Sequence, residues 1–365
     1  MKVVAFVSEL NPFHKGHEYL INKIKESYPN AGIITIMSGD YVQRGEPAIF
    51  DKYTRGKTAI IKGCDLVLEL PALYVLSNAE SFAYHSIRLL HSLQCVDVLA
   101  FGAEHPNLDY LLRAAKVNLE VKDQLQEQHE HNQNLSFNEY IYQCIEDKAS
   151  YRPGSNDILA IEYLAQSLRY QFNFKEFYPI QRIKSPYNEH LHSQYAASSI
   201  RNHIIKNAPC HHMNPSTFFP LYKRLGVLGS FDLNEINEGD ESRIRDALFT
   251  STSYQEFLKK ARHKRLSPSR IRRNCLSSIL EIQPSMRLKH RNSSFIRPIA
   301  SSKKGLSIVS KIASQVPIIQ GKKAFHTLPE LTKELFLLND MHSALYRSLD
   351  SSNYKSDFSF PFYIL

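Results

Sequence analysis

The feature that most constrains the fold of this chain is an alternation of apolar runs and helix-period segments in its first half. Apolar, β-branched runs lie at residues 3–8, 33–37, 66–70, 96–101 and 174–180, with helix-period segments at 17–28, 54–62, 79–93, 108–119 and 157–170. Such alternation is typical of a parallel sheet covered on both faces. It predicts an α/β domain over residues 1–205, a Rossmann-like doubly wound parallel sheet whose ligands bind beyond the carboxyl ends of the strands.

Beyond residue 205 the alternation stops, and we predict a mainly helical, basic second domain over residues 206–365. Ser267 followed by Pro268 is typical of a helix start, with serine as the cap and proline in the first turn. The ending, residues 358–365, is unusually apolar. It could pack on the body of the protein or on a second subunit, so the oligomeric state stays open.

Composition narrows the class of protein. A length of 365 residues with 43% hydrophobic and 22% charged side chains is typical of a folded chain with a sizeable core. The sequence contains no run of about 18 apolar residues, so we expect no membrane span. The N-terminus lacks the pattern of a secretory signal, and five scattered cysteines without a C-x-x-C pair favour a reducing compartment. We therefore expect a cytoplasmic protein.

The segment Asn-Pro-Phe-His-Lys-Gly-His at residues 11–17 joins the first predicted strand to the first predicted helix. The first N–H groups of a helix lack intrahelical partners and lie at the positive end of the helix dipole, so they attract phosphate oxygens. Gly16 lets a phosphate approach the backbone, and His14 and His17 can donate hydrogen bonds to oxygens that gain charge in a transition state. We interpret the turn as a nucleotide-phosphate site.

Other interpretations of this turn stay open. A short His-x-Gly-His match also arises by chance, and the two histidines could be ordinary surface residues. A zinc site is disfavoured, because the spacing is shorter than the helical His-x-x-x-His arrangement and neither cysteine nor carboxylate falls in ligand register nearby. We predict no metal bound by protein side chains.

Two further candidates for ligand contacts stand out. Ser198 and Arg201 lie near a predicted helix start, where hydroxyl and guanidinium groups suit a phosphate, although a plain capped helix is the simpler alternative. A polar loop after the second strand is of a kind that shapes substrate pockets, although its arginine could instead pair with Glu46 at the surface. The candidate substrate residues in this loop are Ser38, Gly39, Asp40 and Arg44.

The charge of the chain is distributed unevenly. Residues 1–202 hold 20 Lys and Arg against 23 Asp and Glu, whereas residues 203–365 hold 25 against 13. One segment carries eight cations and not one acidic residue: Lys259, Lys260, Arg262, Lys264, Arg265, Arg270, Arg272 and Arg273. Such a run favours contact with a nucleic-acid backbone over a merely solvated face. We expect Arg287, Lys289, Arg291 and Arg297 to extend the basic surface.

With these residues placed, the sequence resembles the tRNA(Met) cytidine acetate ligases, a family of the H-x-G-H nucleotidyltransferase-like superfamily. The resemblance is carried by N-P-F-H-K-G-H at 11–17, S-G-D-Y-V-Q-R-G-E-P-A-I-F-D-K at 38–52, D-L-V-L-E-L-P at 65–71, F-G-A-E at 101–104 and S-S-I-R at 198–201. The long second motif is far more specific than the histidine turn. Weaker similarity continues through K-R-L-S-P-S-R-I-R-R at 264–273.

The resemblance implies an ATP-dependent ligase. Acetate would attack the α-phosphate of ATP to give acetyl-adenylate and diphosphate, with Mg²⁺ accompanying the nucleotide. The N4 amine of the wobble cytidine of elongator tRNA(Met) would then take the acetyl group, and AMP would leave. His14, His17 and Arg201 would be the catalytic residues, while the loop at 38–44 and the basic segment would contact acetate or tRNA.

The resemblance also implies which residues contact ATP. They are Val7, Ser8, Glu9, Leu10, Asn11, Pro12, Phe13, His14, Lys15, Gly16, His17, Glu18, Tyr19, Leu20, Gly102, Asn156, Arg182 and Ser198. The family reads N-N-I-L where this chain has N-D-I-L at 156–159, so the contact could instead belong to Asp157. Ala196 and Ala197 replace hydroxyl residues often seen before the serine, so fewer donors would reach the triphosphate.

Two other functions stay open from the sequence alone. An adenylyltransferase acting on a small phosphorylated metabolite would use the same two phosphate motifs, but it would not require a basic second domain. A tRNA-binding module that has lost catalysis would be consistent with the departures at Ala196 and Ala197. Dependence of ATP–diphosphate exchange on acetate distinguishes these functions from the ligase.

Overall fold

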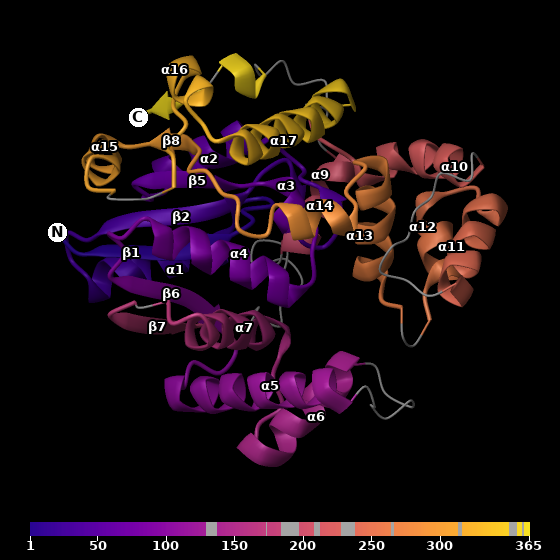
Figure 1. Ribbon diagram of the computed structural model, residues 1–365, viewed down its shortest axis with the longest axis horizontal. Helices are drawn as coiled ribbons and strands as arrows, with labels where there is room; N and C mark the ends of the chain where they lie inside the picture. The colour runs from indigo at the N-terminus through magenta and orange to yellow at the C-terminus, as the bar shows by residue number, and fades with distance from the viewer. Residues whose placement is uncertain are drawn as a thin grey trace.

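The predicted fold class is confirmed by the computed structural model, in which a mostly parallel sheet lies between helices and much of the C-terminal half is helical (Figure 1). The structure describes residues 1–128, 137–172, 174–183, 197–207, 212–227, 238–263, 266–312, 316–349, 356–359 and 361–365. Within these ranges, no helix combines the length and the apolar character needed to cross a membrane.

The central sheet has seven strands in the order β7–β6–β1–β2–β5–β8–β9. They are β1 (Val3–Ser8), β2 (Gly32–Ser38), β5 (Leu66–Leu70), β6 (Val98–Ala103), β7 (Glu176–Gln181), β8 (Pro298–Ser301) and β9 (Tyr363–Ile364). The first five in chain order are parallel: the chain runs from β1 outward to β5, then returns to the other side of β1 to form β6 and β7. The strand order therefore reverses between β1 and β6, which is the switch point of a doubly wound sheet.

The five predicted strands correspond to β1, β2, β5, β6 and β7. All residues of β2 and β5 are buried. Strands covered on both faces require such continuous apolar sequences, which is why the sequence pattern identified them. A second, two-stranded sheet pairs β3 (Tyr41–Val42) with β4 (Glu46–Pro47) in a hairpin that the sequence analysis did not predict.

The predicted helices of the first half correspond to α1 (Lys15–Ser27), α2 (Lys52–Ile61), α4 (Ala79–Ser92), α5 (Leu108–Gln128) and α7 (Ser155–Arg169). Two further helices in this part were not predicted, α3 (Ala72–Val75) and α6 (Phe137–Ala149). Helix α7 packs against both α4 and α5, α6 packs against α5, and α5 with α6 forms the lower layer of the molecule in Figure 1.

The second half supplies most of the remaining helices. They are α9 (Ala197–Asn207), η1 (Pro215–Phe218), α10 (Phe219–Val227), α11 (Glu238–Thr250), α12 (Tyr254–Ala261), α13 (Pro268–Ile279), α14 (Pro284–Lys289), α15 (Lys303–Val309), α16 (Lys322–His326), α17 (Glu330–Leu349) and η2 (Asp357–Ser359). Helices α10 to α13 form a lobe at the right of Figure 1. The predicted cap of α13 is confirmed, because Ser267 Oγ accepts a hydrogen bond from the backbone N–H of Arg270 at 3.3 Å.

The sheet continues beyond the predicted domain boundary at residue 205. β8 pairs antiparallel with β5, and β9 pairs parallel with β8, so the end of the chain returns to the first sheet. The apolar ending packs on the body of the protein: the Phe358 ring lies against Phe325 and Phe336, and the Tyr363 ring lies against Tyr53. The helices after residue 205 are therefore interrupted by two strands of the catalytic sheet.

A buried ammonium group ties this returning segment to the start of α2. Lys52 Nζ lies 2.8 Å from Glu69 Oε1, 2.5 Å from Asp357 Oδ2 and 3.2 Å from Ser343 Oγ, and all four side chains are buried. Burial opposes the charge, but the carboxylates of Asp357 and Glu69 hold the pKa of Lys52 well above its ordinary value. Lys52 is therefore charged at neutral pH and depends on partners from β5 and η2.

The prediction that Arg297 extends a basic surface is wrong. Its side chain is fully buried and donates hydrogen bonds to the carbonyl oxygens of Ile319 and Asp357. Arg287 is also drawn inward, because it donates to the Leu76 carbonyl. Lys289 and Arg291 do reach the surface, where Lys289 pairs with Glu334 and Arg291 donates to Tyr170.

Replacing the buried ammonium group of Lys52 should destabilise the protein more than replacing an exposed ammonium group. Lys52→Met leaves the Glu69 and Asp357 carboxylates buried without their cation, and we expect a loss of about 3–5 kcal/mol in the free energy of unfolding. Lys62→Met is the matched control, since Lys62 pairs with Glu18 at the surface and should contribute less than about 1 kcal/mol. Urea denaturation of both variants measures the difference, and equal losses would contradict the assigned role.

Candidate active site

The candidate active site lies at the switch point of the sheet. The segment Glu9–His14 leaves the carboxyl end of β1, Gly102 lies at the end of the neighbouring β6, and Arg182 directly follows β7. Parallel strands bring these three positions to one edge of the sheet, and doubly wound sheets bind ligands at the point where the strand order reverses. Residues that are distant in sequence are thus brought together by the topology alone.

Contacts from two later segments fix the turn between β1 and α1. Asn11 Oδ1 accepts a hydrogen bond from the backbone N–H of Ile49 at 2.8 Å. The Asn11 carbonyl oxygen accepts one from Arg201 Nη1 at 2.7 Å. The Asn11–Pro12 peptide bond is cis, and Leu10 adopts a positive φ of 47°. The turn is therefore a tightly folded unit held by the segment after β4 and by α9.

The two histidines of the turn cap α1 through the same ring nitrogen. His14 Nδ1 accepts from the Gly16 backbone N–H at 3.0 Å, and His17 Nδ1 accepts from the His14 backbone N–H at 3.2 Å. A neutral imidazole whose Nδ1 accepts carries its proton on Nε2. The ring centroids lie 3.8 Å apart, so two Nε2–H donors stand side by side at the start of a helix.

Electrostatics keeps both rings neutral. Burial, followed by the nearby guanidinium groups of Arg182 and Arg201, lowers the pKa of His14 to about 4. Burial, with His14 and Arg182 beside it, lowers the pKa of His17 well below its ordinary value. At neutral pH the rings act as uncharged hydrogen-bond donors, and the positive charge of the site comes from the two arginines and the helix N-terminus.

The predicted contacts on β6, α7 and β7 do come together. Arg182 Nη1 donates to Asn156 Oδ1, and a Cβ added to Gly102 would lie 3.4 Å from Arg182 Cγ. The Glu104 carboxylate accepts hydrogen bonds from Asn156 Nδ2 at 2.6 Å and from the backbone N–H of Asp157 at 2.9 Å. These residues form one hydrogen-bonded group at the carboxyl edge of the sheet.

Asn156 is better placed than Asp157 to contact a ligand. The Asp157 side chain is fully buried and accepts hydrogen bonds from the backbone N–H groups of Glu104 at 2.8 Å, His105 at 3.2 Å and Gly154 at 3.1 Å. Its carboxylate therefore organises the loop after β6. Asn156 is partly exposed and touches Arg182.

Comparisons with known proteins show the family of this chain. The family model described as HIGH Nucleotidyl Transferase matches residues 1–231 and 229–358. A tRNA(Met) cytidine acetate ligase of Thermosipho melanesiensis is 32% identical over 87% of this chain and 84% of the relative, and one of Clostridium novyi is 31% identical over 100% of both. The chain belongs to the tRNA(Met) cytidine acetate ligase family.

Solved structures show the same fold. Thermotoga maritima TmcAL bound with alpha-thio ATP gives a TM-score of 0.83 at 24% identity, with all of both chains covered. The apo form of that protein gives a TM-score of 0.82 at the same identity and coverage. The similarity extends over the whole chain, including the helical lobe and the strands that return to the sheet.

In this member of the family, Arg201 stands among charges of both signs. The Arg201 guanidinium lies close to Glu9, Glu46, Arg44 and Arg272, and burial lowers its pKa against the opposing effect of the two carboxylates. Arg44 is exposed on the hairpin, and Ser198 is exposed in the first turn of α9. The predicted catalytic residues His14, His17 and Arg201 thus surround one short turn.

The remaining residues of the predicted ATP segment divide between core and surface. Ser8, Leu10 and Pro12 are buried, and Phe13, Tyr19 and Leu20 pack against the core beneath α1. The partly buried Val7 packs against a separate core cluster. Lys15 and Glu18 form an ion pair of 3.3 Å at the surface of the helix. ATP contacts by these residues stay a prediction, and the inward-facing ones can reach a ligand only through backbone atoms.

Ser38, Gly39 and Asp40 are buried beneath the site rather than exposed within it. Asp40 lies 3.8 Å from Lys52, and a Cβ on Gly39 would lie 2.6 Å from Glu69 Oε1. The Arg55 guanidinium, also buried, donates to the carbonyl oxygens of Ser38, Gly39 and Glu9. Their predicted substrate contact stays a prediction, since these contacts give the long motif an architectural function.

The basic segment divides into an exposed part and a part that touches the catalytic half. Lys259, Lys260 and Arg262 are exposed at the end of α12, whereas Lys264 and Arg265 lie outside the described residues. On α13, which also carries Arg270, Arg272 pairs with Glu46 and Arg273 donates to the Gln43 carbonyl at 3.4 Å. Gly45 fits against this helix at a φ of +79°, because a Cβ there would lie 2.3 Å from the Arg273 nitrogen.

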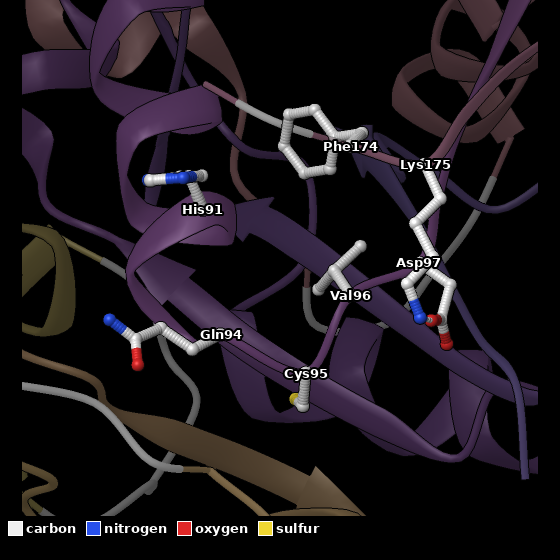
Figure 2. A pocket seen from close by; sticks show the side chains of 7 residues that line it. All are labelled: His91, Gln94, Cys95, Val96, Asp97, Phe174 and Lys175. Carbon is white, nitrogen blue, oxygen red and sulfur yellow. Dashed lines mark hydrogen bonds and ion pairs between the residues drawn. The ribbon is translucent and has the colours of Figure 1, made fainter. Parts of the chain in front are cut away.

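A hollow elsewhere on the protein lies apart from the site. Figure 2 shows that it is lined by His91, Gln94, Cys95, Val96, Asp97, Phe174 and Lys175. These residues precede β6 and β7 or end α4, so the hollow lies at the amino ends of the strands, away from the switch point. An ion pair of 2.6 Å joins Asp97 and Lys175 there. None of the predicted site residues lines it.

Sequence analysis missed the residues that position Asn156 and the loop after β6. Glu104 organises Asn156 and Asp157, and His105 and Tyr151 bond to the Asp157 carboxylate. Glu104 lies in the F-G-A-E motif, which was a signal for it, whereas Tyr151 stands in no motif. Their function depends on contacts between segments about fifty residues apart, for which a single sequence carries no pattern.

Gly16→Ala should weaken ATP binding while the fold is retained. The added Cβ would lie 2.8 Å from His14 Cε1 and 3.0 Å from His14 Nδ1, so the ring must leave its capping position. We expect affinity for ATP to fall roughly tenfold, the equivalent of about one charge-assisted hydrogen bond. Gly321→Ala is the control, because nothing lies within 4 Å of its added Cβ. Calorimetric titration with ATP and thermal unfolding of both variants check the result.

Proposed function

We propose that this protein is an ATP-dependent ligase that activates acetate as acetyl-adenylate and transfers the acetyl group to N4 of the wobble cytidine of elongator tRNA(Met). The observation that carries the proposal is the pair of Nε2–H donors at the start of α1, flanked by Arg182 and Arg201. This arrangement suits an adenylation reaction. The names of the relatives supply the acceptor, and the basic α12–α13 face supports it.

In the first step an acetate oxygen attacks the α-phosphorus of ATP, and the bond to the β-phosphate oxygen breaks. Diphosphate leaves with the bonding electrons, and no proton needs to move. The chain therefore has to position the two reactants and stabilise the negative charge on the phosphate oxygens. Neutral Nε2–H groups of His14 and His17, the N-terminus of α1 and the guanidinium of Arg201 provide this stabilisation.

Mg²⁺ would reduce the charge of the triphosphate when bound with the nucleotide. Within the described ranges, no three His, Cys, Asp or Glu side chains form a group that could hold a metal ion. The nearest histidines present protonated Nε2 atoms, which cannot ligate a metal. The ion would thus be held by phosphate oxygens and water rather than by a protein cage.

In the second step the cytidine amine attacks the acetyl carbonyl, and AMP leaves. A base within a folded anticodon loop has to leave its stack to reach the activated acyl group. The cations of α12 and α13 are placed to hold the RNA backbone, because α13 contacts the β3–β4 hairpin beside the catalytic turn. Such backbone contacts position the substrate and do not read its sequence.

The function is tested by two assays on the whole chain. ATP–diphosphate exchange that requires acetate, in the absence of tRNA, is expected for the ligase. Mass analysis of nucleosides from tRNA incubated with the protein, ATP and labelled acetate should then show labelled N4-acetylcytidine. Exchange that requires a phosphorylated metabolite and ignores acetate would favour an adenylyltransferase, and tRNA binding without ATP binding would favour an inactive module.

His17 offers a sharp test of the donor role. His17→Ala should lower acetate-dependent exchange by about a hundredfold, because one preorganised donor to the reacting phosphate is lost. His17→Gln can place an N–H near the Nε2 position, whereas His17→Asn can replace only the Nδ1 acceptor. We expect the glutamine variant to retain more activity than the asparagine variant. The reverse order would show that the cap, and not the donor, is what catalysis needs.

Replacing the exposed cations at the end of α12 should affect RNA binding alone. Replacing Lys259, Lys260 and Arg262 with alanine should weaken tRNA binding and lower its salt slope by about 1 for each lost phosphate contact, while exchange persists. A charge-matched control replaces the exposed Lys303, Lys322 and Lys323 of α15 and α16, which lie away from α12 in Figure 1. Equal weakening by both triple variants would contradict a localised RNA site.

Replacing a cation of α13 with alanine should affect catalysis as well as tRNA binding. Arg272→Ala removes the ion pair with Glu46 on the β3–β4 hairpin, so we expect exchange without tRNA to fall along with tRNA binding. Steady-state exchange and filter binding on the same preparation measure the two effects. Loss of tRNA binding with unchanged exchange would show that the contact with the hairpin has no catalytic consequence.

A further inference from the structure

The adenylation step moves no proton, yet the turn between β1 and α1 contains a carboxylate, Glu9, which is also one of the predicted ATP contacts. Glu9 follows the end of β1 and stands two residues before Asn11, whose carbonyl bonds to Arg201. Its Oε1 accepts a hydrogen bond from the backbone N–H of Gln43 at 2.8 Å. Within the described ranges no hydrogen bond to Oε2 occurs, and the side chain is partly exposed. One oxygen therefore anchors the carboxylate, and the other is available to a substrate.

Titratable groups from four elements face this carboxylate. The charged ones are Arg44 of the hairpin, Arg55 of α2 and Arg201 of α9, and the fourth is the neutral phenol of Tyr163 of α7. Burial raises the pKa of Glu9 above its ordinary value, against the Gln43 N–H and the three arginines. A carboxylate whose pKa is raised is a stronger base than a solvated one.

The second half-reaction requires a proton acceptor, whereas the first does not. When the exocyclic amine attacks the acetyl carbonyl, its nitrogen gains a fourth bond and becomes strongly acidic. This nitrogen must lose a proton before AMP departs. If it does not, the amine is expelled from the acetyl carbon and the reactants form again. The nitrogen of a cytosine is a weak nucleophile because its lone pair is delocalised into the ring, so assistance by a base should accelerate the step substantially.

The other candidate bases around the turn are already engaged. His14 and His17 use Nδ1 to accept backbone N–H groups and carry their protons on Nε2, so they cannot accept another at neutral pH. Glu46 pairs with Arg272, and Glu104 accepts hydrogen bonds from Asn156. Of the carboxylates and imidazoles that the structure describes beside the turn, Glu9 retains an accessible oxygen.

We propose that Glu9 is the general base of acetyl transfer: its Oε2 takes a proton from the N4 amine of cytidine. The C–N bond forms, the bond between the acetyl carbon and the phosphate oxygen breaks, and AMP leaves with that electron pair. The proton on Glu9 then passes to solvent. The proposal rests on the proposed function, since it assigns a residue to its second step.

The test separates the two half-reactions. Glu9→Gln keeps an oxygen that can accept the Gln43 N–H and removes only the basic one. Because Glu9 also lies in the predicted ATP segment, we expect acetate-dependent ATP–diphosphate exchange to fall, but by less than about tenfold, the equivalent of about one hydrogen bond. Single-turnover transfer from preformed acetyl-adenylate to tRNA should fall about a hundredfold. Glu26→Gln, which removes an exposed carboxylate at the far end of α1, is the matched control and should change neither rate.

The pH profile distinguishes a base from a positioning residue. In the wild type, transfer should decline on the acidic side as Glu9 becomes protonated, and this decline should disappear in Glu9→Gln. Glu9→Asp should be slower than the wild type and keep the decline. An unchanged acidic limb in Glu9→Gln, or equal loss of exchange and transfer, would overturn the proposal. A wild-type protein without acetate-dependent exchange would instead overturn the proposed function, and the role of Glu9 with it.

Discussion

The site depends on one buried ammonium group. Lys52 is enclosed by carboxylates that belong to β5 and to the end of the chain, and the cluster is stable only while all partners are present. Lys52 begins α2, and Arg55 on the next turn of the same helix donates to the backbone carbonyls of Ser38, Gly39 and Glu9. The position of the catalytic turn is therefore linked, through one helix, to the closing segment of the chain.

The β3–β4 hairpin connects this framework to the surface. Its backbone N–H at Gln43 bonds to Glu9 on the inner side, and Glu46 pairs with Arg272 of α13 on the outer side. Gly45 permits the close approach, because a side chain there would collide with the backbone of α13. A hairpin of two-residue strands thus lies between the catalytic turn and the helix that we assign to RNA binding.

The sequence was sufficient for features that depend on local pattern. Continuous apolar runs predicted β1, β2 and β5, and the Ser267–Pro268 pair predicted the start of α13. It was insufficient where charged residues are buried by distant partners. Arg297 was expected at the surface but is buried, and no local pattern in the sequence indicated that Ser38, Gly39 and Asp40 are buried near Lys52, because Lys52 and its partner Asp357 are 305 residues apart. The histidine turn was found from its residues, but the acceptor role of each Nδ1 required the structure.

A division of charge along the chain explains why both halves must meet at the hairpin. An excess of acidic residues in the first part would repel RNA, and the cations of the second part compensate for it. Attraction to a polyanion is long-ranged and imprecise, whereas acyl transfer needs the amine within bonding distance of an activated carbonyl. The Glu46–Arg272 pair neutralises one cation of the RNA-binding helix and in return fixes that helix beside Glu9 and Arg201. Arg272 therefore gives up one phosphate contact, and in this way the distance between the bound RNA and the adenylate becomes defined. A ligase with two successive substrates requires such a defined distance.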